Sequence, residues 1–485
     1  MDWLQAPNAW LARLLLERAI AGVYLVAFLV ALNQFPALLG ERGLLPTPRY
    51  LARVPFQRSP SLFHRYYSDR FVRAISCVGI VLSASLLGGL PQTGPVWAPM
   101  LVWTILWLLY LSIVNVGQTF YAFGWESLLL EAGFLSILLG PASIAPPVPV
   151  LWAFRWLLFR VEFGAGLIKI RGDTCWRDLT CLYYHHETQP MPNPLSWYFH
   201  HLPKPVHRLE VLGNHVTQLV VPFLLFFPQP FASAAGVAML AHQSWLIASG
   251  NFAWLNALTL ALAFSAFDDA WLGTVLPFEH GPLAAAPTWF SMLVVAFAVV
   301  VLVLSFWPAR NLLSRRQLMN ASFNPLHLVN AYGAFGSITR ERFEIVIEGT
   351  DAPQASPDAV WREYAFKGKP GDPARRPPQV APYHLRLDWL MWFAAMSTPM
   401  SHPWLLVLTE KLLLADRQTL RLLRRDPFDG RRPTFVRASL YRYRFSTRRE
   451  RRERGVWWIR TQVGAYIPPL SLEETVPDAR HRSAS

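Results

Sequence analysis

Charged residues are scarce in this sequence. Only 16% of the 485 residues are Asp, Glu, Lys or Arg, whereas soluble domains carry roughly 25%. Hydrophobic residues make up 53% of the chain, with 21 Trp and 31 Phe among the aromatic ones. A soluble fold of this composition would leave many apolar side chains in water, so the composition argues against a soluble protein.

The chain also lacks the motifs of common enzymes and of nucleic-acid-binding proteins. It contains no nucleophile elbow, no glycine-rich phosphate loop, and no zinc-finger or helix-turn-helix pattern to accompany its net charge of +14. We therefore expect no nucleic acid partner, no cofactor and no bound metal. Contact with the anionic lipids of a bilayer explains the excess of Arg better.

Cysteine is rare as well, with three in the whole chain. Cys77 lies in an apolar run, where we expect an inert packing residue. Cys175 and Cys181 are close enough in the sequence to form a disulfide in an oxidising compartment. Two free thiols are the alternative, and spacing alone does not decide between them.

Long apolar runs, by contrast, are frequent. Many approach the roughly 20 residues that cross a bilayer as a helix. The run at 234–267 is too long for one span and contains Ser249-Gly250-Asn251, so we interpret it as two helices joined by a turn. The sequence thus predicts a polytopic α-helical membrane protein of eight or nine spans. The apolar runs are 19–39, 74–90, 98–115, 121–140, 148–168, 209–227, 234–267 and 288–307.

Charged residues interrupt some of these runs. Glu126, Glu131, Arg155 and Arg160 would each be costly in a bilayer, by roughly 2.5–3.5 kcal/mol on insertion scales. We therefore expect them to face the interior of the bundle, with Glu126 or Glu131 paired to Arg155 or Arg160. Such pairs would hold helices together. A polar transport pathway built by Glu126, Glu131 and Arg155 is the weaker alternative.

After residue 310 the pattern changes from spans to strands. Runs rich in β-branched and aromatic residues, each followed by turn residues, predict strands at 342–350, 361–372, 435–445 and 457–467. We divide the chain into a transmembrane domain at 1–309, a strand-rich extramembrane domain at 310–470 and a disordered tail at 471–485.

Two further segments of the extramembrane domain have distinct patterns. Residues 403–425 have the spacing of an amphipathic helix whose leucines face the domain or the bilayer. The charged stretch STRRERRERG at 446–455 is expected at a solvated hairpin tip between two strands.

A polar loop at 169–208 follows the fifth span. It includes most of the sequence GLIKIRGDTCWRDLTCLYYHHETQPMPNP, which runs from Gly166 to Pro194. One hypothesis is acid–base catalysis by its Lys, Asp and His groups within 169–201. Another is a metal site, although consecutive His185, His186 and Glu187 do not have the usual ligand spacing. The third is recognition, because alternating prolines surrounded by aromatic side chains form a stiff segment that suits docking to a membrane or a protein.

The number of spans predicts which segments share a side. With nine spans, loop 40–73, loop 169–208 and the C-terminal domain lie on one face of the membrane. Loop 40–73 contains seven Arg, whereas loop 268–287 on the other face contains Asp268, Asp269 and Glu279 and neither Lys nor Arg. The positive-inside rule places the shared face in the cytoplasm, while a disulfide in the loop would require the opposite.

The loop resembles the signature loop of the lipase maturation factor family. The similarity covers GLIKIRGDTCWRDLTCLYYHHETQPMPNPLSWYFHHLP at 166–203 and YAFGWESLLLEAGFL at 121–135. It continues through YAFKGKPGDPARRPP, YHLRLDWLMWFAAM and DPFDGRRPTFVRASLYRYRF, from about residue 15 to residue 468. The resemblance implies a multi-pass membrane protein that helps secreted clients, such as homodimeric lipases or other exported hydrolases, to fold or assemble.

The resemblance also implies a location and a set of functional residues. Members in animals lie in the endoplasmic reticulum membrane with the loop and C-terminal domain facing the client compartment. We expect a bacterial member in the inner membrane, so this compartment would be the periplasm. The remaining alternative is an enzyme, remotely like the membrane domain of vitamin K-dependent carboxylases. The expected client-binding residues of the loop are Lys169, Arg171, Asp173, Cys175, Trp176, Arg177, Asp178, Cys181, His186, Glu187, Gln189, Pro190 and Asn193. In the C-terminal domain they are Arg386, Asp388, Trp389 and Trp392.

Overall fold

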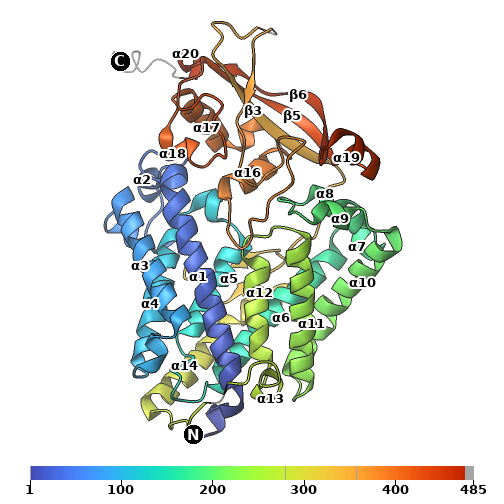
Figure 1. Ribbon diagram of the computed structural model, residues 1–485. Coiled ribbons are helices and arrows are strands. Elements are labelled where there is room, and N and C mark those ends of the chain that lie inside the picture. The colour runs from blue at the N-terminus through green and yellow to red at the C-terminus, as the bar shows by residue number, and fades with distance from the viewer. Residues whose placement is uncertain (1, 279, 357, 476–485) are drawn as a thin grey trace.

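A bundle of long helices carries a domain built around a β-sheet at one of its ends (Figure 1). The computed structural model describes residues 2–278, 280–356 and 358–475. The bundle consists of α1 (Trp10–Leu39), α3 (Asp69–Gly88), α4 (Trp97–Asn115), α5 (Gly124–Ser136), α6 (Val148–Arg171), α10 (Lys204–Leu219), α11 (Phe231–Ser249), α12 (Leu255–Ala263) and α14 (Thr288–Leu304).

These helices agree with the eight or nine predicted spans. Six helical stretches within the described residues are long and apolar enough to cross a membrane, and they include α1, α3, α4, α10, α11 and α14. Helices α5 and α12 are shorter, while α6 is long but carries several charges. The break between α11 and α12 falls at Gly250, at the turn predicted from the sequence.

Helix α1 packs next to α3, α5 and α12 (Figure 1). Its apolar residues extend around the whole helix, and most side chains from Leu16 to Leu39 are buried. One stripe, which includes Gly22, Leu25 and Leu29, is only partly buried. Helix α3 is different, because one of its faces points outward. Cys77 lies on that outward face, so the prediction that it is a packing residue is wrong.

The short helices mark the two ends of the bundle. Four of them are at the end next to the C-terminal domain, and α13 is at the opposite end, near the N-terminus (Figure 1). The short helices are α2 (Thr47–Leu51), α7 (Thr174–Arg177), α8 (Leu182–Thr188), α9 (Ser196–His200) and α13 (Asp269–Leu272). The loops 40–73 and 169–208 therefore share one end with the C-terminal domain, as the count of nine spans predicts.

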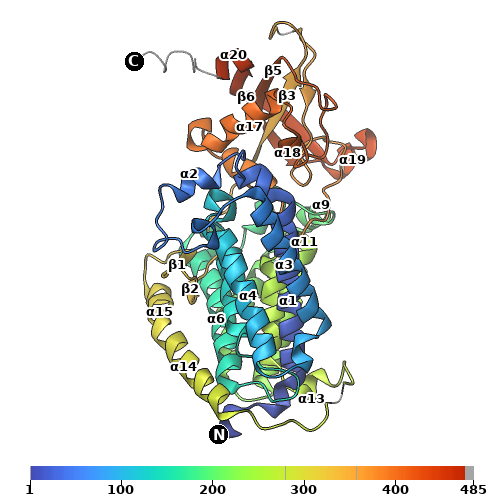
Figure 2. The same cartoon turned by 90° about the vertical axis from the view of Figure 1, so that its left-hand side faces the viewer.

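Several 3-10 turns complete the helical part. They are η1 (Asp2–Leu4), η2 (Pro7–Ala9), η3 (Leu62–His64), η4 (Pro91–Thr93), η5 (Gln118–Tyr121), η6 (Val221–Phe226), η7 (Phe264–Ala266) and η8 (Pro399–Ser401). After α14, helix α15 (Phe306–Leu313) runs along the side of the bundle towards a small pair of strands, β1 (Ala321–Ser322) and β2 (Asn330–Ala331) (Figure 2).

The C-terminal domain is built on a four-stranded antiparallel sheet with the order β4-β3-β5-β6. Its long strands are β3 (Arg342–Thr350), β5 (Phe435–Phe445) and β6 (Trp458–Leu470). Strands β3 and β5 pair from Arg342 with Tyr443 to Thr350 with Phe435. The three long strands confirm the prediction, whereas β4 is only Arg362–Glu363 because the following GKPGDP sequence does not continue a ladder.

The helices of this domain differ in part from the sequence prediction. Residues 384–396 contain α16 (Arg386–Ala394), and 403–425 form two helices, α17 (Pro403–Leu413) and α18 (Arg417–Leu420), instead of one. Ala415 has a positive φ of 48° between them, which ends the first helix. One face of α17 packs into the domain through Leu405, Leu408 and Leu412, as their spacing predicts.

The charged stretch 446–455 is a helix instead of an open hairpin tip. Helix α19 (Arg448–Arg454) forms because Thr447 and Glu450 make a reciprocal capping box at its start. Near the C-terminus, α20 (Leu472–Thr475) occupies the beginning of the segment predicted to be a disordered tail. Residues 476–485 of that tail lie outside the described residues.

Candidate functional site: the polar loop and its contacts with the C-terminal domain

Glu131 and Arg160 form a buried ion pair between α5 and α6, one of the pairings that the sequence predicted. The same carboxylate accepts hydrogen bonds from the Asn330 backbone N–H at 3.0 Å and from the Tyr332 hydroxyl at 2.8 Å. Arg160 donates to the Asn330 carbonyl oxygen at 2.6 Å. The segment after α15 therefore folds back and completes a charge network that two bundle helices begin.

Glu126 pairs with a residue of the C-terminal domain, not with Arg155 or Arg160. Its Oε1 lies 2.8 Å from the Arg386 guanidinium, and its Oε2 accepts a short hydrogen bond from Tyr110. Arg386 also donates to the Phe120 carbonyl oxygen at 2.7 Å and stacks over the Tyr121 ring. The first turn of α16 is therefore inserted into the end of the bundle.

The contacts of Arg155 do not fit the alternative of a polar transport pathway. It donates to backbone carbonyl oxygens of Ser265, at 2.9 Å, and Leu225, at 3.3 Å. Glu126, Glu131 and Arg155 thus belong to three separate sets of contacts, each of which joins structural elements. The arrangement gives no support to a transport pathway through these residues.

The polar loop begins with a small disulfide-closed turn. Asp173 caps α7 by accepting a hydrogen bond from the Cys175 N–H at 3.0 Å, and it pairs with Arg340 at 2.8 Å, not with Arg171 or Arg177. Cys175 and Cys181 form a disulfide, which is one of the two alternatives left open by the sequence. Trp176 donates its indole N–H to the Phe335 carbonyl oxygen at 2.9 Å. These contacts attach the turn to the segment that leads into β3.

Asp173 is the loop residue whose ionisation the fold favours. Burial alone would raise the pKa of its carboxyl, but hydrogen bonds from Arg340 and from the backbone N–H groups of Cys175 and Ile338 outweigh that effect and lower the pKa. Burial lowers the pKa of His186 well below its usual value, with smaller contributions from neighbouring histidines.

The middle of the loop covers the C-terminal end of α11. A helix leaves its last carbonyl groups without partners, and here the loop supplies them. The Gln189 amide donates to the Ser249 carbonyl oxygen at 3.0 Å, and the Asn193 amide donates to those of Ile247 and Ala248 at 3.1 and 3.0 Å. The loop thus acts as a cap on a membrane helix.

The alternating prolines are held through their carbonyl oxygens. Proline has no N–H group, but each carbonyl group remains an acceptor. The carbonyl oxygen of Pro190 accepts from Arg342 at 3.0 Å, that of Pro192 from Asn251 at 3.1 Å, and that of Pro194 from Arg376 at 3.0 Å. Arg342 begins β3 and Arg376 also belongs to the C-terminal domain, so the proline stretch joins this domain to the bundle.

The structure shows how far each loop residue expected to bind a client is exposed. The bundle, α11 and the C-terminal domain bury most of these residues. The buried ones are Lys169, Cys175, Trp176, Cys181, His186, Gln189, Pro190 and Asn193. Asp173 and Glu187 are partly buried, whereas Arg171, Arg177 and Asp178 are exposed.

The residues expected in the C-terminal domain have similar roles. Arg386, Asp388 and Trp389 are buried, and Trp392 is partly buried. Asp388 accepts hydrogen bonds from the backbone N–H groups of Gly368 and Lys369, and burial raises the pKa of its carboxyl. The Trp392 indole donates to the carbonyl oxygen of Thr188 in the loop at 3.1 Å.

The groups proposed for acid–base chemistry are tied to different partners. The Lys169 ammonium donates to Asn214 at 2.9 Å and Gln218 at 2.8 Å. Asp173 binds Arg340, and Asp178 is exposed. The structure therefore does not assemble Lys169 and these aspartates into the proposed acid–base site.

Sequence reasoning missed the residues that connect the loop to the sheet. Arg342 is fully buried and donates to the carbonyl oxygens of Glu187 and Gln189 as well as Pro190. Its guanidinium pairs with Glu344, whose other carboxylate oxygen lies 2.9 Å from the Lys369 ammonium. In the sequence, Arg342 and Glu344 look like the solvent-facing positions of an alternating strand. Only the packing of β3 against the loop shows otherwise.

The fold and these contacts define a class of multi-pass membrane proteins in which an extramembrane domain is fixed to the bundle through one polar loop. Residues 11–274 match the family model described as the lipase maturation factor transmembrane domain. Residues 328–468 match the lipase maturation factor C-terminal domain. The chain belongs to the lipase maturation factor family.

Two curated relatives show how far the similarity extends. Lipase maturation factor 1 of Homo sapiens is 46% identical, over 99% of this chain and 91% of that protein. Lipase maturation factor 2 of Homo sapiens is 28% identical, over 95% of this chain and 83% of that protein. No solved structure matches this chain.

Proposed function

We propose that this chain is a membrane-embedded maturation factor for exported lipases, which it contacts with the face formed by the polar loop and the C-terminal domain. The observation that carries this proposal is the similarity to lipase maturation factors across both the bundle and the C-terminal domain. The contacts between loop and domain support it, because they make the two parts one continuous surface above the membrane.

The proposed contact surface is the hollow between α9 and α19. Its lining combines aromatic and basic side chains from both parts: Trp197, Tyr198, His201, Arg448, Arg451 and Arg452. The Arg451 guanidinium lies over the Trp197 ring at 4.4 Å, and the Tyr198 side chain is 45% exposed. Trp, Tyr and Arg are the residues that most often dominate the binding energy of protein interfaces.

The disulfide supports a location of this face in an oxidising compartment. Disulfides persist in oxidising compartments such as the reticulum lumen or the periplasm. Cys175 and Cys181 are paired, and the helices α7 and α8, which contain Cys175 and follow Cys181, lie at the same end of the bundle as the sheet domain (Figure 1). This favours placing the shared face on the oxidising side, against the arginine count of loop 40–73. A client that is being exported passes through that compartment.

The test is co-expression of the chain with a homodimeric lipase in cells that lack their own lipase maturation factor. We expect the chain to raise lipase activity per amount of secreted lipase without changing lipase mRNA. Tyr198→Ala combined with Arg451→Ala should lose most of the gain, whereas Arg449→Ala, an exposed change on the same helix α19, should keep it. Equal lipase activity with and without the chain would rule the proposal out.

A further inference from the structure

His186 is buried in an unusual environment for an imidazole. Its side chain is 2% exposed, and in the described part of the chain neither ring nitrogen has a hydrogen-bond partner. Buried polar groups are nearly always hydrogen-bonded, because a buried polar group without a partner loses its hydration without compensation. A ligand that the ring binds would supply this compensation.

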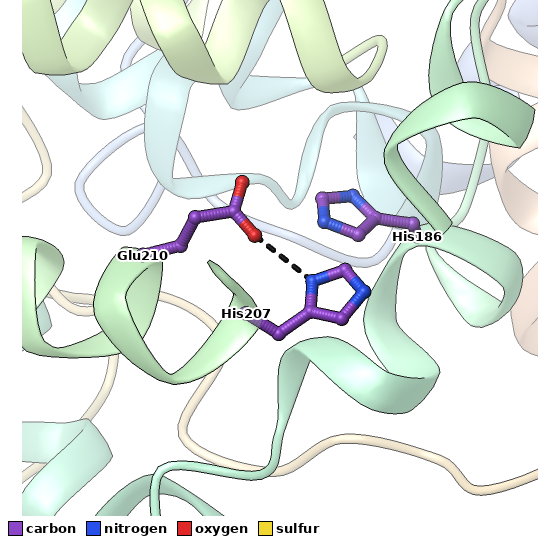
Figure 3. Close-up of side chains that lie close together, drawn as sticks. All are labelled: His186, His207 and Glu210. Carbon is purple, nitrogen blue, oxygen red and sulfur yellow. Dashed lines mark hydrogen bonds and ion pairs between the residues drawn. The ribbon is translucent and has the colours of Figure 1, made fainter. Parts of the chain in front are cut away.

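Two ligand-forming side chains lie beside this ring. His207 and Glu210 are on α10 with i,i+3 spacing, which puts both on one face of the helix. They point towards His186 of α8 (Figure 3). One ring nitrogen from each histidine and one carboxylate oxygen all lie within 4.8 Å of one another.

The inner atoms of His207 and Glu210 contact each other, and their outer atoms have other partners. His207 Nε2 is 3.4 Å from the His200 carbonyl oxygen, and Glu210 Oε1 accepts a hydrogen bond from the Trp245 indole at 2.9 Å. In the neutral tautomer that carries its proton on Nε2, His207 donates a hydrogen bond to this carbonyl oxygen, and its Nδ1 is an acceptor. It lies 2.9 Å from the second acceptor, Glu210 Oε2, so a cation between the two atoms would be favoured. Metal-binding histidines commonly donate their other ring nitrogen to a carbonyl in this way.

We propose that His186, His207 and Glu210 bind one Zn²⁺ ion, which links α8 of the polar loop to α10 of the bundle. Two imidazole nitrogens and one carboxylate oxygen form a donor set that zinc accepts in tetrahedral geometry, with a fourth position left for another ligand. With bonds of about 2.0–2.1 Å, tetrahedral ligand atoms are spaced about 3.3 Å apart, so His186 has to move inward on binding.

The fourth position has room for a small ligand. His186 and Glu210 line a cavity of about 440 Å³ between the loop, α10 and α11. Most of its wall is apolar, with Trp176, Trp245 and Phe252 among the residues that surround it. The site is independent of the lipase function proposed above, because it stands on the three side chains alone.

The experiment uses the full-length protein in detergent, stripped with a chelator and then equilibrated with buffered zinc. We expect wild-type protein to retain about one equivalent of zinc and to unfold at a higher temperature with zinc than without it. His186→Gln and Glu210→Gln should retain little zinc and lose that shift. His201→Gln changes a nearby histidine that is not one of the three zinc ligands, and it should retain zinc as the wild type does.

A spectroscopic measurement on the wild-type protein tests the proposal without relying on variants that could lose zinc by misfolding. X-ray absorption of the zinc-loaded protein should show nitrogen and oxygen neighbours at about 2.0–2.1 Å and no sulfur. Sulfur ligands, a preference for iron, or equal loss of zinc in His201→Gln would each overturn the proposal. So would a wild-type protein that retains no more zinc than His186→Gln, which would mean that His207 and Glu210 form an ordinary salt bridge only.

Discussion

Glu126 and Glu131 lie on the same short helix, yet different parts of the molecule neutralise them. Glu131 is paired by Arg160 of the neighbouring bundle helix α6 and by the segment after α15. Glu126 is paired by Arg386, which is more than 250 residues away in the C-terminal domain. One charge therefore closes the bundle, and the other attaches the extramembrane domain to it. Removing each partner should reveal the two roles separately.

The largest effect is expected for Arg386→Met. This change leaves Glu126 buried without its cation, which costs about 3–5 kcal/mol, and it removes the contact that anchors α16. Thermal unfolding in detergent should shift strongly, and limited proteolysis should release the C-terminal domain. Adding Glu126→Gln should recover part of the loss. Arg449→Met, an exposed arginine of α19, is the control, and an Arg386→Met protein as stable as that control would contradict the anchor.

Arg160→Met should cost less, about 3 kcal/mol, because Glu131 keeps its hydrogen bonds from Asn330 and Tyr332. The bundle should unfold at a lower temperature, while the C-terminal domain stays attached until the bundle melts. Thermal unfolding in detergent and limited proteolysis, as for Arg386→Met, measure these two effects. If Arg160→Met released the domain as readily, the two glutamates would not have separate roles.

Cys175→Ser combined with Cys181→Ser tests the disulfide-closed turn. Closing a loop this short stabilises by about 2 kcal/mol in the chain-entropy model, so unfolding should occur earlier, and a reductant should have the same effect on the wild type. Cys77→Ser removes an exposed thiol and should change nothing. Insensitivity of the wild type to reductant would show that the turn is held by its other contacts.

Gln189→Leu should loosen the loop over the end of α11. It removes the amide that donates to the Ser249 carbonyl oxygen, and leaving this acceptor unpaired should lower the free energy of unfolding by about 1–2 kcal/mol. Hydrogen exchange should quicken at 182–200 and at the last turn of α11, with Gln418→Leu on the exposed side of the C-terminal domain as the control. Unchanged exchange would mean that the cap does not hold the loop.

Asp173→Asn should have the smallest effect. The pKa of Asp173 is lowered in the folded protein, so the stabilisation is present above the pKa of the unfolded chain and is lost as the pH falls through the folded value. Arg340 is well exposed, which limits the contribution to about 1 kcal/mol or less. Wild-type stability should therefore fall slightly more than that of Asp173→Asn on acidification, and identical pH profiles would argue against the pairing.

The sequence predicted the parts of the fold that depend on local pattern. Apolar length identified the spans, the break at Gly250 located the turn between α11 and α12, and alternation located β3 and β5. It did not predict α19, because the capping box of Thr447 and Glu450 was overlooked in a stretch that looked only charged. The sequence also predicted a single helix where α17 and α18 form, because nothing in the leucine pattern indicates the positive φ of Ala415.

Long-range pairing was harder to predict than the elements. The sequence left four possible pairings of two glutamates with two arginines, and the pair of Glu131 with Arg160 was one of them. Arg386 was singled out only through the family resemblance, without its partner Glu126. The partners of the loop could not be found by spacing, because Asn251, Arg342 and Arg376 approach the prolines from three distant segments. His207 and Glu210 had a usable signal, a histidine and a glutamate three residues apart on one helix, but His186 joins them only in the folded chain.

The most direct test of the account maps which side of the membrane the loop and the C-terminal domain occupy, by glycosylation in a eukaryotic host. Asp178→Asn creates an acceptor with the native Thr180, and Arg452→Asn with Arg454→Thr creates one on α19. Val275→Asn with Pro277→Thr serves as the control at the other end of the bundle. All are made in an Asn320→Gln background, because Asn320 begins a native acceptor sequence.

The account predicts that the acceptors at 178 and 452 both become glycosylated and that the acceptor at 275 does not. Glycosylation of only one of the first two, or of the acceptor at 275 alone, would contradict a common client-facing surface on the oxidising side.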